Sequence, residues 1–175
     1  MAGQLIQVAT NTVTSPVASV TLTGINSDDV YMLAISNMTV SADTSMKMRL
    51  TYSSGTPDTS LNYDKATKQL RADTTFENIY GTNQDHFFLG TTSTSALQES
   101  FQGIYYLFNF NNASEYSFVT VEDATRNTSG LLRGQQGGFV VTQTRANDGI
   151  QILTDTANNI ETGHLLYIRW YNNGR

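Results

Sequence analysis

The chain has 175 residues, of which 39% are hydrophobic and 14% are charged, and its formal net charge at pH 7 is −5. This length suits one domain with its own core, and nine Tyr and eight Phe are more aromatic residues than disordered chains usually carry. An acidic balance with only ten Lys and Arg argues against a nucleic-acid-binding surface, and the absence of cysteine excludes disulfide bonds, thiolate zinc sites and cysteine nucleophiles.

Alternation of apolar and polar residues predicts β-strands along most of the chain. In chain order, the expected strands are Leu5–Ala9, Val13–Ile25, Val30–Ile35, Ser45–Tyr52, Ile104–Phe110, Tyr116–Glu122, Gly138–Arg145, Ile150–Thr154 and Leu165–Tyr171. The clearest is Ser45–Tyr52, in which two Met, a Leu and a Tyr share one face and basic residues share the other. Because a helix would spread those basic residues around its apolar face, a half-buried antiparallel strand is expected.

Turn signals rich in Gly, Asn, Asp or Pro separate these strands, at Gly24–Asp29, Ser53–Asp58 and Asn109–Ser114. Short strands at this spacing predict an all-β fold, namely a single-domain β-sandwich or jelly roll of about nine antiparallel strands with little helix. The short helical candidates are Asp64–Ala72 and Ser93–Phe101, and neither is long enough to be stable without packing.

Two further stretches carry expectations of their own. From Arg145 onward the chain reads as strand, polar loop and strand, and the last strand is expected to close the fold because its Leu, Tyr, Ile and Trp would be an aggregation hazard if exposed. The stretch 55–100 is the least regular and is rich in Thr, Ser, Asn and Gly. It is expected to be a loop-rich insertion, or an interface that a partner covers.

No residue pattern points to catalysis, a cofactor or a metal. His86 and His164 are the only histidines, and no nucleophile-elbow or zinc-binding motif accompanies them. Asp28-Asp29 and Asn147-Asp148 lack the spacing of a calcium loop and read as turns. The glycine-rich run 131–138 lacks the Lys-Ser/Thr of a phosphate-binding loop and reads as a flexible or close-packed loop. The chain is therefore expected to be non-enzymatic, with no cofactor and no metal.

Aromatic residues supply the candidates for an interface. The expected strand Ile104–Phe110 contains four of them, which must face both sides of its sheet. One side fills the core, and the other must meet a sheet, a loop or another subunit, because large exposed aromatic patches are rare on monomers. A protein interface is favoured, and a stacking platform for sugars is the alternative. The candidate interface residues are Phe87, Phe88, Tyr105, Tyr106, Trp170 and Tyr171.

Several short motifs follow one another in a recognisable order. They are Val20–Ile25, a strand with Tyr31, Leu33 and Ile35, then Met48-Arg49-Leu50, Leu61-Asn62-Tyr63, Arg145 with Asn147–Ile152, a loop with Asn159 and Thr162-Gly163, and a last aromatic strand. In this order, over most of the chain, they resemble a family of small β-sandwich virion structural proteins of tailed phages of marine bacteria, such as cyanophages. The resemblance implies a building block of the particle without enzymatic activity, and no catalytic residue carries over.

The function expected from this resemblance is that of a phage virion structural protein, a tail-associated component or capsid decoration that binds neighbouring virion subunits. Low charge and abundant Ser, Thr and Asn suit side-by-side packing, and a homo-oligomer is expected, as a trimer or higher ring. The expected location is the virion, after assembly in the host cytoplasm, with no nucleic-acid partner and no membrane insertion.

Two other classes of function remain open from the sequence. The alternative is a carbohydrate-binding host-attachment module, whose partner would be a host surface glycan. Its signature would be exposed aromatic residues among Phe87, Phe88, Tyr105 and Tyr106. A glycan-cleaving enzyme is the third class, for which the sequence nominates no acid and base.

Overall fold

The computed structural model describes residues 4–92, 99–126, 129–155 and 158–171, with only the backbone described at 4, 166–168 and 170–171. These residues form thirteen β-strands and no α-helix. The strands are β1 (Gln4–Val13), β2 (Ser19–Thr23), β3 (Val30–Val40), β4 (Thr44–Tyr52), β5 (Thr56–Pro57), β6 (Tyr63–Arg71), β7 (Glu77–Gln84), β8 (Phe87–Thr92), β9 (Phe101–Phe108), β10 (Ser117–Arg126), β11 (Leu132–Val141), β12 (Gly149–Thr154) and β13 (Ile160–Tyr171).

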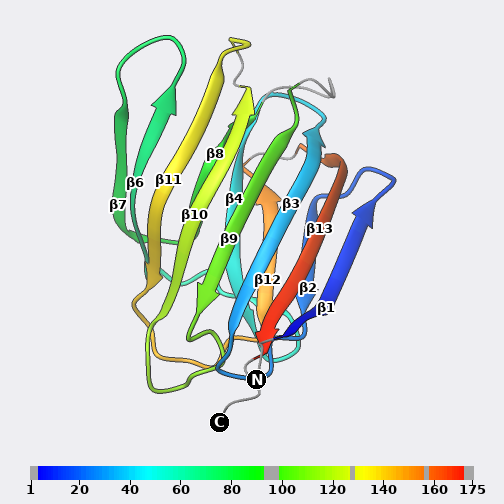
Figure 1. Cartoon of the computed structure of the whole chain (residues 1–175), viewed down its shortest axis with the longest axis vertical. Helices are drawn as coiled ribbons and strands as arrows, with labels where there is room; N and C mark the ends of the chain where they lie inside the picture. Colours follow the sequence, from blue (N-terminus) through cyan, green and yellow to red (C-terminus); the bar gives the residue numbers. More distant parts are fainter. Residues whose placement is uncertain (1–3, 93–98, 127–128, 156–157, 172–175) are drawn as a thin grey trace.

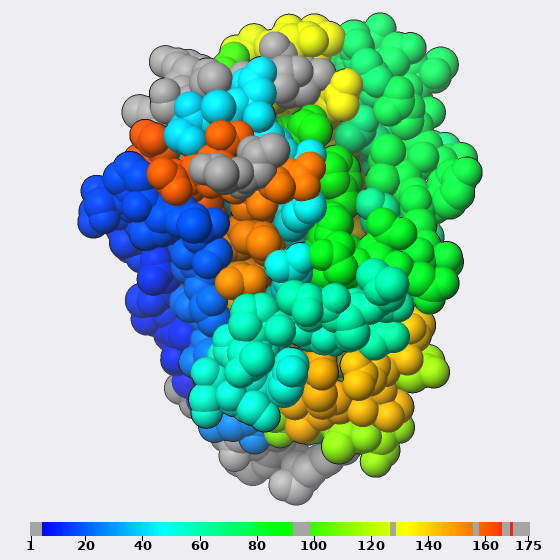
Figure 2. Space-filling model, turned by 180° about the vertical axis from the view of Figure 1, so that it is seen from behind, coloured from blue at the N-terminus to red at the C-terminus, as the bar shows by residue number. Residues whose placement is uncertain are grey.

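Two antiparallel sheets pack face to face, which confirms the predicted all-β sandwich (Figure 1). The large sheet has the order β1-β13-β3-β9-β10-β11-β6-β7. The small sheet has the order β2-β12-β4-β5, and β8 also pairs with β4. Figure 2 shows the molecule from behind, where β2, β12, β4 and β8 lie side by side and the segment after β4 crosses their lower end.

The chain is wound as a jelly roll. β1 pairs with β13, β2 with β12, β3 with β9 and β4 with β8, so strands from the first half pair in nested order with strands from the second half. Successive members of each half alternate between the large and the small sheet, which is the double-sheet arrangement of a jelly roll. The outermost pair places Val13 opposite Gly163, so the C-terminal strand does close the fold as predicted.

Two insertions widen the large sheet. β5, β6 and β7 come between β4 and β8, and β10 and β11 come between β9 and β12. β10, β11, β6 and β7 then add to the edge of β9 in that order, in front of β8 (Figure 1). The inner side of this extension packs on β8, and its outer side carries exposed side chains.

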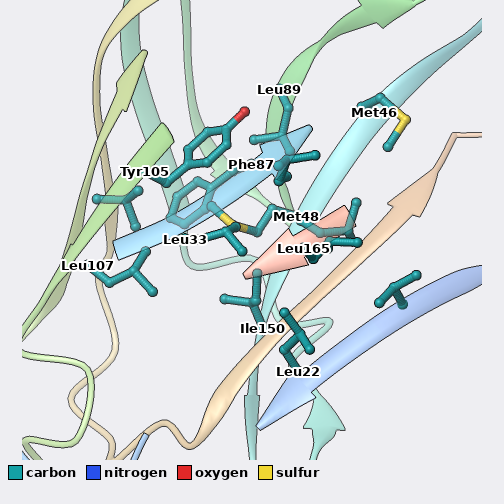
Figure 3. Packing of buried hydrophobic residues seen from close by; sticks show 14 of the residues in the cluster. Leu22, Leu33, Met46, Met48, Phe87, Leu89, Tyr105, Leu107, Ile150 and Leu165 are labelled. Atoms are coloured by element: carbon teal, nitrogen blue, oxygen red, sulfur yellow. The ribbon is translucent and has the colours of Figure 1, made fainter. Parts of the chain in front are cut away.

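The core confirms the alternation predicted for β4 as far as Leu50, after which Thr51 is fully buried and Tyr52 only half-buried. Met46, Met48 and Leu50 are fully buried, and the intervening Lys47 and Arg49 are only half-buried. Side chains from the two sheets meet between the layers, as Figure 3 shows. Full burial of one such side chain stabilises the fold by about 1.5–3 kcal/mol, so these inner rows hold the sheets together.

The turn before β12 joins three connections at one end of the sandwich. Asp148 donates its N–H to the Thr51 carbonyl at 2.8 Å, and its carboxylate accepts the Thr51 hydroxyl at 2.7 Å. The same carboxylate accepts the Gly55 N–H at 3.0 Å, and the Asp148 carbonyl accepts the N–H groups of Gly24 and Ile25 at 3.0 and 3.1 Å. The predicted turn thus has a structural role that links the ends of β2, β4 and β12.

The prediction of a helix at Asp64–Ala72 is wrong, because this stretch forms β6. Ala66 and Leu70 are four residues apart, as on a helix face, but both lie on the outer side of the sheet. The inward positions are instead taken by polar residues such as Thr67 and Gln69, which are buried. Because the core side of β6 is partly polar, the sequence does not show the apolar alternation by which strands were predicted elsewhere.

The stretch 55–100 differs from its expected irregularity, since it contains β5, β6, β7 and β8. Each of the strands predicted elsewhere overlaps an observed strand, so the additional strands all come from this stretch. Of the second helical candidate, residues 93–98 lie outside the described part of the chain, and Phe101 begins β9.

The glycine-rich run 131–138 was predicted as a loop, but its residues from Leu132 onward lie in β11. The run is nevertheless closely packed against β6, as the same prediction allowed. At Gly137 φ is 153°, and a Cβ there would lie 2.5 Å from the Ala66 carbonyl oxygen. Glycine therefore allows β11 to approach β6 in the middle of the large sheet.

Candidate subunit interface

The outward side of β9, β10, β11, β6 and β7, here named the exposed sheet face, carries a group of apolar side chains open to solvent. On β9, Ile104 and Tyr106 are 41% and 44% exposed, and on β10 Phe118 is 46% exposed. Each lies between residues that face the core, such as Tyr105 and Val119, because side chains alternate along a strand. These exposed side chains lie on paired strands, so the hydrogen bonds between the strands fix their positions.

Strand register arranges the exposed sheet face in rows across the strands. One row consists of Tyr106, Thr120, Gly138, Ala66 and Tyr80. It is aromatic at both ends and small in the middle, and none of its members is charged. Tyr80, on the edge strand β7, is 80% exposed. This row makes an uncharged centre for the face.

The neighbouring row carries charges of both signs. It consists of Ile104, Glu122, Gln136, Lys68 and Asn78. Glu122 and Lys68 are exposed on either side of Gln136, and neither forms an ion pair with another residue in the described ranges. Because Gly134 and Leu70 form the next row, these charges lie inside the face, and a partner that covers the face has to match both of them.

Two hollows lie on this face, one on each side of the charged row. The first has a volume of about 420 Å³ and lies over Gly138 and Ala66, with Phe118 at its side. The second has a volume of about 520 Å³ and lies over Gly134, with Leu70 among its lining residues. Both exist because the outward residues of β11 include glycines, which leave space above the sheet.

The prediction that Phe87 and Tyr105 belong to an interface is corrected by their burial, because both are fully enclosed in the core. Phe87 stacks on Phe139 with ring centroids 4.6 Å apart. The Tyr105 ring lies over Gly103, where any Cβ would be 2.8 Å from a ring carbon. Both side chains stabilise the sandwich from within, where no partner subunit or glycan can reach them.

The other predicted interface residues have different positions. Tyr106 lies on the exposed sheet face, in the uncharged row. Phe88 is half-buried, and the Lys65 ammonium lies 4.7 Å from the centre of its ring. Trp170 and Tyr171 are in β13, and their side chains lie outside the described part of the structure.

Sequence reasoning missed Ile104, Phe118 and Tyr80 as members of the face. A signal for Phe118 was present, because Val119 and Val121 mark the core side of the same predicted strand and leave Phe118 on the other side. Tyr80 had no such signal, since β7 was not predicted and its register comes from pairing with β6.

Both histidines make contacts that suit structural roles. His86 Nδ1 lies 2.6 Å from Asp85 Oδ1, and Arg49 Nη2 lies 2.5 Å from the other oxygen of that carboxylate. Partial burial lowers the pKa of His86, against the effect of Asp85. His164 Nδ1 lies 3.1 Å from the Thr12 hydroxyl, across the β1–β13 pair. Within the described residues, no group of three or more His, Cys, Asp or Glu could hold a metal ion.

Asp123 is a buried acid on the inner side of β10. Its carboxylate accepts the Tyr105 hydroxyl hydrogen bond at 3.1 Å. Burial raises its pKa well above the ordinary value, although hydrogen bonds from Tyr105 and from the Gln135 backbone act in the opposite direction. An unfolded aspartate releases its proton near pH 3.9. Above that pH the folded chain still holds the proton, so stability falls as pH rises toward the folded pKa.

Asp123→Asn is therefore expected to stabilise the fold at pH 7, because the amide is neutral at every pH and still has an oxygen to accept the Tyr105 hydrogen bond. The gain should shrink as the pH falls toward 4, where the acid is protonated in both states. Thermal unfolding of both proteins between pH 4 and 7 measures this. A variant no more stable than the wild type at pH 7 would contradict the burial of an ionisable acid at this position.

No helix in the described ranges has the length and apolarity that crossing a membrane requires. Comparison of the chain with protein-family models, with curated proteins and with solved structures found no match in any of the three. What the protein does is therefore inferred from its own residues, and above all from the exposed sheet face.

Proposed function

We propose that this chain is a non-enzymatic structural protein of a phage virion, a tail-associated component or capsid decoration, which binds neighbouring virion subunits through the exposed sheet face. One observation carries the proposal, namely that Ile104, Tyr106 and Phe118 stand open to solvent on the same outward side of the large sheet. Monomers rarely leave such a patch uncovered, and aromatic residues are enriched at protein interfaces.

Two further points support a role in a particle. The sequence motifs resemble those of phage virion proteins, and several of them fall on structural features of the jelly roll, such as the turn at Asp148. The jelly roll is also a fold of viral capsid domains, although lectins share it. That fold likeness is an analogy and leaves the choice of function to the surface.

The second candidate, a carbohydrate-binding module for host attachment, is favoured by the hollow over Gly138. An aromatic ring at its side and the polar groups of Asp64, Thr82 and Thr120 around it resemble the lining of a sugar site. Against it, the apolar side chains extend well beyond this hollow, to Ile104 and Leu132. A subunit covers a surface of that extent better than a sugar ring does.

Incorporation into particles tests the proposal. In a phage that encodes Phe118→Asp, we expect at least a tenfold loss of this protein from purified particles, measured by quantitative mass spectrometry, because a charge is placed in the apolar contact. The matched control is Leu61→Asp, since Leu61 is 64% exposed and lies outside the strands of the face, between β5 and β6. Normal incorporation of Phe118→Asp, or absence of the wild type from particles, would contradict the proposal. Binding of the monomer to a glycan array, lost in Phe118→Asp, would favour the second candidate.

A further inference from the structure

We propose that the partner on the exposed sheet face is a second copy of this chain, packed face to face about a two-fold axis that runs along β11. The inference rests on the proposed function only in that both use the same face. It follows from the way in which apolar and charged residues are distributed about β11.

The uncharged row is nearly symmetric about β11. Gly138 lies at its centre, Thr120 and Ala66 lie on the adjacent strands, and Tyr106 and Tyr80 lie one strand further out. A two-fold axis along β11 places each strand over its counterpart across the axis in the second copy. Each Tyr106 then faces Tyr80 of the second copy, and small residues meet small residues at the centre. Packed sheets stand about 10 Å apart, a distance that the facing tyrosines can span. At the centre, the hollow over Gly138 and Ala66 lies over the same hollow of the second copy.

The charged row is antisymmetric about the same strand. Gln136 lies at its centre, with Glu122 on one adjacent strand and Lys68 on the other. Adjacent strands are about 4.8 Å apart, so both charges lie at the same distance from the axis. Rotation about β11 therefore brings Glu122 over Lys68 of the second copy, and Lys68 over Glu122 of the second copy. One dimer gains two ion pairs of opposite charge.

This charge pattern also selects the direction of the axis. A two-fold axis in the plane of the sheet but perpendicular to β11, through Gln136, would place Glu122 over Glu122 of the second copy and Lys68 over Lys68 of the second copy. Like charges in that position repel. Of these two axes, the one along β11 makes the charged row self-complementary, as an isologous contact requires.

Two charges on the face have no opposite charge in this arrangement. Arg126, at the outward end of β10, instead donates hydrogen bonds to the Gly130 carbonyl within its own subunit. Asp64 lies in the row of Phe118 and Val140, at the end of the face. It already accepts the Asn83 N–H hydrogen bond at 2.8 Å within its own subunit. Rotation about β11 places Asp64 over Phe118 of the second copy, so a half-buried carboxylate faces each Phe118 at this end of the face.

A charge exchange tests the dimer. The full chain and the variants Lys68→Glu, Glu122→Lys and Lys68→Glu/Glu122→Lys would be examined by size-exclusion chromatography with light scattering and by sedimentation equilibrium. Each single variant turns two attractive pairs into two repulsive ones, so we expect the dimer dissociation constant to rise roughly tenfold or more. The double variant restores opposite charges and should return to about the wild-type value. Thermal unfolding of each variant at a concentration where all of them are monomeric, expected to be unchanged, controls for the fold.

The outcomes separate this inference from the virion role. A monomeric or trimeric wild type, single variants that dimerise normally, or a double variant that stays weak would each overturn the two-fold dimer. If such a protein is still present in purified particles and is lost with Phe118→Asp, the virion role stands without the dimer. A dimer that responds to charge exchange but is absent from particles would support the dimer and overturn the virion role.

Discussion

Gly149→Ala is expected to leave little or no folded protein. Gly149 begins β12 and is paired with Thr23 of β2 on one side and Thr51 of β4 on the other. A Cβ at this position would lie 2.0 Å from the Leu22 carbonyl oxygen and 2.9 Å from the Thr23 Cα. These are backbone atoms inside the small sheet, so no side-chain rotation can relieve the clash. The loss of stability should exceed about 4 kcal/mol, beyond the range of ordinary substitutions.

Gly138→Ala is the matched control for this substitution. Gly138 also lies within a strand, but a Cβ there would meet only the Val119 carbonyl oxygen, at an ordinary 3.6 Å. Since glycine inside a strand costs about 0.5–1 kcal/mol relative to alanine, this variant should be as stable as the wild type or slightly more so. Soluble yield and urea unfolding measure both. Similar stability of the two variants would contradict the close β2–β12 approach.

Arg145→Leu is expected to lower the free energy of unfolding at pH 7 by about 3–5 kcal/mol. Arg145 forms an ion pair with Asp58, whose side chain is only 4% exposed. Its guanidinium also lies 3.9 Å from the centre of the Tyr52 ring. Removing the cation leaves a carboxylate buried without its partner, which is the costly way to break a buried pair. Urea unfolding at pH 7 measures the loss.

The double variant Asp58→Asn/Arg145→Leu shows whether the unpaired Asp58 carboxylate causes the loss of stability. With no carboxylate left unpaired, most of the lost stability should return, although the packing on Tyr52 is still missing. A double variant as unstable as Arg145→Leu would mean that the packing, and not the ion pair, holds the connection after β11 against the one before β6.

The sequence predicted strands well where the core side is apolar. β4 was read correctly because Met46, Met48 and Leu50 alternate with basic residues. β6 was misread because its core side carries the buried polar residues Thr67 and Gln69, the second of which lies in a polar region beside Asp123. Periodicity detects apolar burial, so a strand that buries polar groups escapes it.

The candidate interface was predicted in part, for a related reason. Aromatic residues were expected on both sides of β9, and they are there: Tyr105 inward, Tyr106 outward. Nothing in β9 alone says which side is the core, since both sides look apolar. The answer comes from Gly103, which makes room for the inward Tyr105 ring, and from β3 and β10 on either side.

The amino-acid order alone establishes that this is a β-rich chain with one alternating apolar face per strand, because alternation is a local property of extended backbone. The folded arrangement establishes what local pattern cannot. Pairs such as Val13 with Gly163 join distant parts of the chain, and the register of β10, β11 and β6 sets Glu122 and Lys68 on either side of Gln136. The exposed sheet face exists only after those strands have met, because no single strand contributes more than a few of its residues.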